Sequence, residues 1–122
     1  MAAHNELGKW GEDKASEFLQ LNGYQIIERD WKSGRRDIDI VATNGTEVVF
    51  VEVKTRRNCL YGTPEEAVDY RKLQSLRLAI NHYIKYRHIN CDVRFDIISV
   101  VGTVGTVGQE PKIDHIKGVP LY

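Results

Sequence analysis

Three acidic residues and a lysine lie on neighbouring stretches of the sequence that both look like buried β-strands. The stretch DIDIVA at 37–42 carries Asp37 and Asp39, and EVVFVEVK at 47–54 carries Glu52 and Lys54. Carboxylates that point into one space repel each other unless they share a proton or a cation. A hard divalent cation such as Mg²⁺ prefers such oxygen ligands and is usually held by one or two carboxylates plus phosphate oxygens. These residues therefore suggest a metal site.

The lysine adds a second chemical function. Lys54 follows Glu52 by two residues, so both side chains project from the same face of a strand. An ammonium group there can position an attacking water and neutralise charge on a phosphate. The combination is suited to metal-assisted hydrolysis of a phosphodiester. The competing interpretation is a solvated face with cross-strand ion pairs worth about 0.2 to 1 kcal/mol, which fits poorly with Val48 and Phe50 on that same face.

A β-hairpin over about 37–54 should position these side chains. Asn44-Gly45 is the favoured two-residue hairpin turn, and counting back from it pairs Asp39 with Phe50 and Asp37 with Glu52. On this register one face carries the charged residues, and the other is purely apolar. The apolar face consists of Ile38, Ile40, Val49, Val51 and Val53. The register does not decide whether Asp37 or Asp39 would bind the metal.

Helices are predicted on either side of this hairpin. The first spans about 6–22, capped by Asn5 and stopped by Gly23, and Glu12 borders its apolar face. Gly8 and Gly11 weaken its first turns, which indicates that something packs closely there. The second spans about 64–86 and opens with the capping box of the segment TPEE at 63–66.

The remaining segments complete one domain over 1–122. Residues 24–27 read as a short strand, ERDWKSGRR at 28–36 as turn-like around Ser33 and Gly34, and 102–108 as a flexible glycine-rich turn. Alternation over 92–101 predicts a strand that pairs with the hairpin, and 112–116 can add an edge strand. Helices and strands in this order predict an α/β or α+β fold with a central mixed sheet.

Composition limits the function classes. Seventeen basic residues balance seventeen acidic ones, so attraction to nucleic acid must be local. Four basic residues near the acids are candidate phosphate contacts: Arg36, Arg56, Arg57 and Lys72. The two cysteines and four histidines have no zinc spacing, and no segment has the roughly 18 apolar residues of a membrane span. Without an apolar leader, we expect a soluble cytoplasmic protein.

Several motifs together resemble a known family. They are Gly11-Glu12, Gly23-Tyr24, DIDIVATNGTEVVFVEVKTR, and YGTPEEAV with Lys72. With these motifs the chain resembles, over roughly 8–100, the YraN-like family of small bacterial proteins. That family is similar to the Holliday-junction resolvases of archaea and to PD-(D/E)xK nucleases. The resemblance implies a restriction-endonuclease-like fold and a metal-dependent nuclease.

The resemblance also assigns roles to individual residues. Asp39 matches the motif aspartate, in preference to Asp37, and Glu52, Val53 and Lys54 match its E-x-K. Glu12 matches the additional acid of the resolvase-like branch. The implied ligands of Mg²⁺ or Mn²⁺ are Asp39, Glu52, the Val53 carbonyl and Glu12, while Lys54 orients the attacking water. Two positions depart from the pattern, namely Ile38 in place of Pro and Arg36 in place of Gly.

The implied substrate is DNA, with branched or junction DNA as the class that the resemblance indicates. A homodimer would suit the cutting of two strands at a junction. The main alternative is a DNA-binding or adaptor protein that keeps the nuclease fold without cutting. A third interpretation is a structural or regulatory protein whose hairpin face is a partner interface, and that protein would have no affinity for divalent ions.

Overall fold

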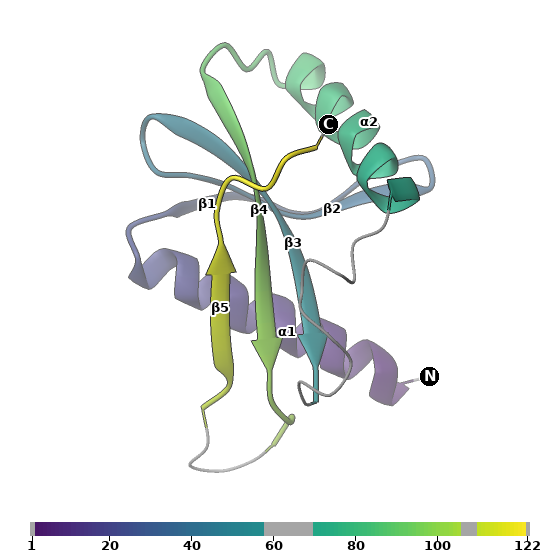
Figure 1. Cartoon of the computed structure of the whole chain (residues 1–122), viewed down its shortest axis with the longest axis vertical. Helices are drawn as coiled ribbons and strands as arrows, with labels where there is room; N and C mark the ends of the chain where they lie inside the picture. The colour runs from purple at the N-terminus through teal and green to yellow at the C-terminus, as the bar shows by residue number, and fades with distance from the viewer. Residues whose placement is uncertain (1, 58–69, 106–109, 122) are drawn as a thin grey trace.

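The computed structural model describes residues 2–57, 70–105 and 110–121. They form two helices and a five-stranded sheet (Figure 1). The helices are α1 (Ala2–Leu21) and α2 (Tyr70–Tyr86). The strands are β1 (Gln25–Ser33), β2 (Arg36–Thr43), β3 (Glu47–Arg56), β4 (Asp92–Val101) and β5 (Lys112–Ile116).

The sheet is mixed, as predicted, with its strands in the order β1-β2-β3-β4-β5. All neighbours are antiparallel except β3 and β4, which run parallel, and α2 lies in the connection between them. The two helices lie on opposite sides of the sheet (Figure 1). This arrangement confirms the α+β prediction and is compatible with a nuclease-like fold. No helix in the described ranges is long and apolar enough to span a membrane.

Alternating apolar residues give each face of the sheet its own core. Val48 and Phe50 of β3 pack with Phe95 and Ile97 of β4 against α2. On the other face, a core that includes Val49, Val51, Ile98 and Val100 packs against Ala15 and Leu19 of α1. The strand predicted over 92–101 and the edge strand over 112–116 are confirmed at their predicted bounds. Alternation indicated the first of these strands, although both of its faces are covered and its residues are buried without interruption from Phe95 to Val100.

The predicted hairpin forms, but its register was wrong. Thr43 pairs with Val48, and Ile40 pairs with Val51, so the pairing is shifted by two residues from the predicted one. Asn44 explains the longer loop, because its Oδ1 accepts hydrogen bonds from the backbone N–H groups of Thr46 (3.0 Å) and Glu47 (2.8 Å). The asparagine side chain thus replaces the hydrogen bonds of a tighter turn.

Ile38 was also assigned to the wrong face. It packs in the core beneath α2 with Val41, whereas Ile40 belongs to the core beneath α1. The alternation of β2 is therefore interrupted at Asp39. The shift in register is even, so it alone would have left the two faces unchanged. The interruption lies where the pairing between β2 and β3 ends, at Ile40.

Helix α1 begins at Ala2, so Asn5 lies within the helix and is not its cap, contrary to the prediction. The predicted stop is confirmed. Gly23 has a positive φ of 88°, and the N–H of Tyr24 donates to the Leu19 carbonyl at 2.9 Å, closing the last turn.

The predicted close packing of α1 occurs at one of its two early glycines. A Cβ on Gly11 would lie only 2.7 Å from Cγ2 of Thr55 on β3, whereas a Cβ on Gly8 would meet nothing within 4 Å. Gly11 therefore allows α1 to lie directly on β3, and this contact sets the position of Glu12, the next residue.

Strand β1 is longer than predicted, because it continues from Gln25 through the charged stretch to Ser33. Its polar side chains face solvent along the edge of the sheet, which is why they read as turn-like. The turn itself is where it was expected, with Gly34 at φ 62°. The end of α2 at Tyr86 matches the prediction, and the capping box at 63–66 lies outside the described residues.

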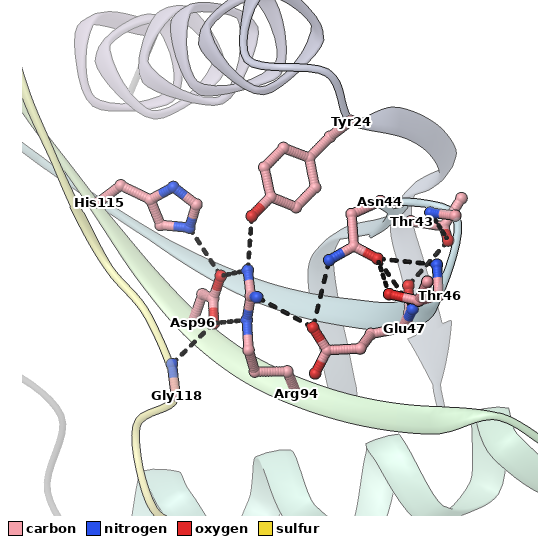
Figure 2. Close-up of polar contacts among 10 residues, drawn as sticks. Tyr24, Thr43, Asn44, Thr46, Glu47, Arg94, Asp96, His115 and Gly118 are labelled. Carbon is pink, nitrogen blue, oxygen red and sulfur yellow. Dashed lines mark hydrogen bonds and ion pairs between the residues drawn. The ribbon is translucent and has the colours of Figure 1, made fainter.

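A buried polar network ties the C-terminal segment to β4 (Figure 2). Asp96 is fully buried and receives hydrogen bonds from Arg94 Nε at 2.9 Å and from the Gly118 N–H at 3.0 Å. His115 Nε2 lies 2.6 Å from Asp96 Oδ2, and Arg94 also donates to Tyr24 Oη at 2.6 Å. Burial opposes ionisation of Asp96, but hydrogen bonds from His115 and Arg94 outweigh it and lower the pKa of the carboxyl group.

Candidate metal and phosphate site

The candidate site lies where β2 and β3 separate. Asp39 follows the break in alternation of β2, and its Oδ2 accepts a hydrogen bond of 2.8 Å from the backbone N–H of Val53. Val53 stands between Glu52 and Lys54, so this bond joins the predicted aspartate to the predicted E-x-K segment. Asp37 is exposed and contacts Lys32 at 3.9 Å. The structure therefore brings Asp39, and not Asp37, against the motif strand.

Asp39 is held in an environment that disfavours its charge. Burial, followed by the negative charge of Glu52, raises the pKa of the Asp39 carboxyl group to about 8. The Val53 N–H opposes this shift without cancelling it, and the charge of Glu12 adds to it. A carboxyl group with this pKa holds a proton at neutral pH unless a cation replaces that proton.

Glu52 is buried in spite of its charge, with only 4% of its surface exposed. Two ammonium groups approach one of its oxygens. Lys54 Nζ lies 3.5 Å from Oε1, and Lys72 Nζ, which comes from α2, lies 3.0 Å from the same atom. Burial opposes protonation of Lys72, yet the pairing with Glu52 raises the pKa of its ammonium group. Glu52 is thus a buried carboxyl group with two ammonium groups beside one of its oxygens.

Glu12 lies at the margin of this site. It is half-buried on α1, and burial, followed by the charge of Asp30, raises the pKa of its carboxyl group. The charge of Glu12 raises the pKa of Asp39, so the two acids affect each other electrostatically. In the part of the chain that the structure describes, however, no three His, Cys, Asp or Glu side chains are grouped closely enough to hold a metal ion.

The donor set fits a divalent ion that keeps much of its water. Mg²⁺ commonly takes one or two protein carboxylates and fills its other positions with water and substrate oxygens. Asp39 and Glu52 supply those two carboxylates, and the raised pKa of Asp39 indicates that a cation beside it would favour its charged form. Glu12 and the Val53 carbonyl remain predicted ligands.

The predicted phosphate contacts occupy different places. Arg36 is exposed at the start of β2, opposite Ser33. Arg56 ends β3, where its carbonyl accepts a hydrogen bond of 2.9 Å from the Gly102 N–H, and Arg57 is exposed just beyond it. Arg56 and Arg57 follow Lys54 on the same strand, whereas Lys72 approaches from the helix. Lys72 contacts a predicted metal ligand, with its Nζ 3.0 Å from Oε1 of Glu52.

Sequence reasoning assigned Lys72 to the substrate and did not foresee its contact with Glu52. Asp30 was also missed, although its charge raises the pKa of Glu12. No pattern in the sequence indicates either relationship. The first depends on how α2 packs across β3, and the second on the extension of β1 beyond its apolar residues.

Comparisons with known proteins support the resemblance. Residues 11–100 match the model of the uncharacterised protein family UPF0102. The chain is 49% identical over 117 residues to a UPF0102 protein of Bacteroides thetaiotaomicron, covering 96% of this chain and 93% of the relative. It is 39% identical over 123 residues to one of Christiangramia forsetii, covering 100% and 99%. A Porphyromonas gingivalis relative is 45% identical over 115 residues, with coverage of 94% and 84%.

Proposed function

The chain belongs to the UPF0102 family, the YraN-like group, and from its own site we propose that it is a metal-dependent nuclease that hydrolyses DNA phosphodiester bonds. The observation that carries the proposal is the Asp39 carboxyl group. Burial and the neighbouring Glu52 raise its pKa to about 8, and its Oδ2 accepts a hydrogen bond from the N–H of Val53, the residue before Lys54 on the adjacent strand.

In this proposal Asp39 and Glu52 would hold the ion, with Glu12 and the Val53 carbonyl as further candidate ligands. A divalent ion bound there would polarise the phosphate and lower the pKa of a coordinated water. The Lys54 side chain is largely buried, with 20% of it exposed. Its ammonium group can orient the attacking water and offset charge on the phosphate.

Binding of the DNA backbone also requires positively charged side chains outside the metal site. Arg56 and Arg57 follow Lys54 directly and are the first candidates, with Arg36 on the neighbouring strand as another. Contacts to phosphate position DNA without reading its sequence. This agrees with the branched or junction DNA that the family resemblance implies, because such a substrate is recognised by shape.

One observation favours a second candidate function, namely a DNA-binding adaptor that does not cut. Glu52 is paired with two lysines, Lys54 and Lys72. A carboxyl group in this position can hold the two lysines in place without binding a metal. Arg36, Arg56 and Arg57 would then bind DNA without hydrolysis.

The test is cleavage of labelled linear, flap and four-way-junction DNA by the full chain, with Mg²⁺, with Mn²⁺ and with neither ion. The variants Glu52→Gln and Lys54→Met are run beside the wild type, and Asp37→Asn serves as a matched acidic control. We expect metal-dependent cleavage that both site variants lose and the control retains. DNA binding without cleavage in either metal would instead support the adaptor, and wild-type cleavage preserved in both site variants would refute this site.

A further inference from the structure

One oxygen of Glu52 has two ammonium groups near it, which is one more than the E-x-K motif provides. The E-x-K pattern provides a single lysine, and Lys54 fills that place at 3.5 Å from Oε1. Lys72 approaches the same oxygen more closely, at 3.0 Å. A buried carboxylate with two ammonium groups on one oxygen is well stabilised without a metal, so the second lysine must oppose metal binding electrostatically.

The two lysines differ in how easily their ammonium groups can move away from Glu52. Lys54 is anchored on β3 and has 20% of its side chain exposed, whereas Lys72 stands near the start of α2 with 43% exposed. A long side chain on a helix surface can release its ammonium group into solvent without disturbing the core. Lys72 is therefore the partner that an arriving cation would displace.

We propose that Lys72 is a second active-site lysine, which holds Glu52 in the metal-free protein and contacts the phosphate under attack once the ion takes its place. This inference rests on the proposed nuclease function and deepens it. The displaced ammonium group stays within one side-chain length of the acids, where the phosphate of the substrate must lie. Its charge then compensates the charge that builds on the phosphate oxygens.

A purely structural ion pair would behave differently. If Lys72 only stabilised Glu52, its removal would leave the buried carboxyl group with Lys54 as its remaining ammonium partner, and the damage would be to folding stability. If Lys72 were a remote phosphate contact, its removal would weaken DNA binding and leave the rate at saturating DNA unchanged. The proposal instead requires opposite effects, namely tighter metal binding together with slower chemistry.

The experiment compares the wild type with Lys72→Met, Lys72→Arg and Arg71→Met. Arg71 is the neighbouring exposed cation on the same helix turn, so its variant is matched in charge. Calorimetry gives the Mg²⁺ dissociation constant of the DNA-free protein. Single-turnover cleavage at saturating Mg²⁺ and DNA gives the chemical rate, and circular dichroism confirms that each variant is folded.

We expect Lys72→Met to bind Mg²⁺ about tenfold more tightly and to cleave about a hundredfold more slowly. Lys72→Arg, which keeps the charge, should recover most of the rate, and Arg71→Met should match the wild type in both measurements. Unchanged or weaker Mg²⁺ binding by Lys72→Met, or an unchanged rate, would overturn the inference while the wild-type nuclease stood. A wild-type protein that neither binds Mg²⁺ nor cleaves would refute the proposed function, and this inference with it.

Discussion

The backbone N–H of Val53 donates a hydrogen bond of 2.8 Å to Oδ2 of Asp39. The residue between Glu52 and Lys54 thereby fixes the acid of the neighbouring strand, and the site becomes one unit that spans β2 and β3. The bond also explains why Asp39 can stay in a place that disfavours its charge. An N–H donor gives the carboxylate one partner, but a second positive partner is still required at high pH.

Asp39→Asn should stabilise the metal-free protein, and increasingly so as the pH rises. The folded-state pKa of Asp39 is about 8 against an ordinary value of 3.8, so between these values the folded state holds a proton that the unfolded state has lost. The free energy of unfolding then falls with rising pH by at most about 1.4 kcal/mol per pH unit. Melting temperatures in EDTA at pH 5 and pH 9 test this. A gain that is equal at both pH values would contradict it, and Asp37→Asn controls for surface charge.

Mg²⁺ should raise the melting temperature of the wild type but not of Asp39→Asn or Glu52→Gln. A ligand at ten times its dissociation constant stabilises the folded state by about 1.4 kcal/mol, which corresponds to a shift of a few degrees. The shift should grow from pH 6 to pH 9, because the ion displaces the Asp39 proton. Thermal melts across a Mg²⁺ titration measure it. Equal shifts in all three proteins would place the ion elsewhere.

Gly11→Ala should destabilise the fold, whereas Gly8→Ala should not. The added methyl group at Gly11 would meet Thr55 Cγ2 at 2.7 Å, while nothing lies within 4 Å of the same group at Gly8. Overpacking of this kind costs about 1 to 3 kcal/mol, and Ala for Gly in an open helix position gains up to about 1 kcal/mol. Urea denaturation of both variants measures the difference. Thr55→Gly in the Gly11→Ala background should recover part of the loss, since it removes the clashing side chain.

Asp96→Ala should cost about 3 kcal/mol or more, because it removes the buried carboxylate that pairs with Arg94 and accepts a hydrogen bond from the Gly118 N–H, and leaves Arg94 with Glu47. The pKa of Asp96 is lowered in the folded state from its ordinary 3.8. Its stabilising contribution is therefore present above that value and is lost as the pH falls through the lower, folded-state pKa. Denaturation between pH 2 and pH 6 should show a steeper acid loss for the wild type than for the variant. Asp92→Asn, exposed at the start of β4, should keep the wild-type slope.

The parts of the fold that could be predicted are those governed by short-range pattern. Alternation alone located β4 and β5, and the Asn-Gly pair located the hairpin turn. The register of that hairpin could not be predicted, because it depends on backbone hydrogen bonds that one side chain, that of Asn44, accepts. The full length of β1 was hidden for a related reason, since an edge strand needs no apolar residues on its open face.

In the candidate site, too, the residues of a short motif could be predicted, whereas contacts that depend on the packing of distant elements could not. The family motif placed Asp39, Glu52 and Lys54 on adjoining strands, and the structure brings all three together around Val53. The contact between Lys72 and Glu52 could not be predicted, because it depends on the crossing of α2 over the sheet. The raised pKa of Asp39 likewise results from burial in three dimensions, which no residue spacing expresses.

The connectivity of the sheet also bears on the order in which the protein folds. Strands β1, β2 and β3 follow one another as a meander, whereas β4 reaches β3 only after the α2 crossover, with Glu47 paired to Asp92. Short loops close at lower entropic cost, so the meander has the faster route to its native contacts. Asp39 and Glu52 would therefore meet before Lys72 arrives to offset them. For a folding chain, this makes the two acids an early electrostatic barrier that cations in the medium can lower.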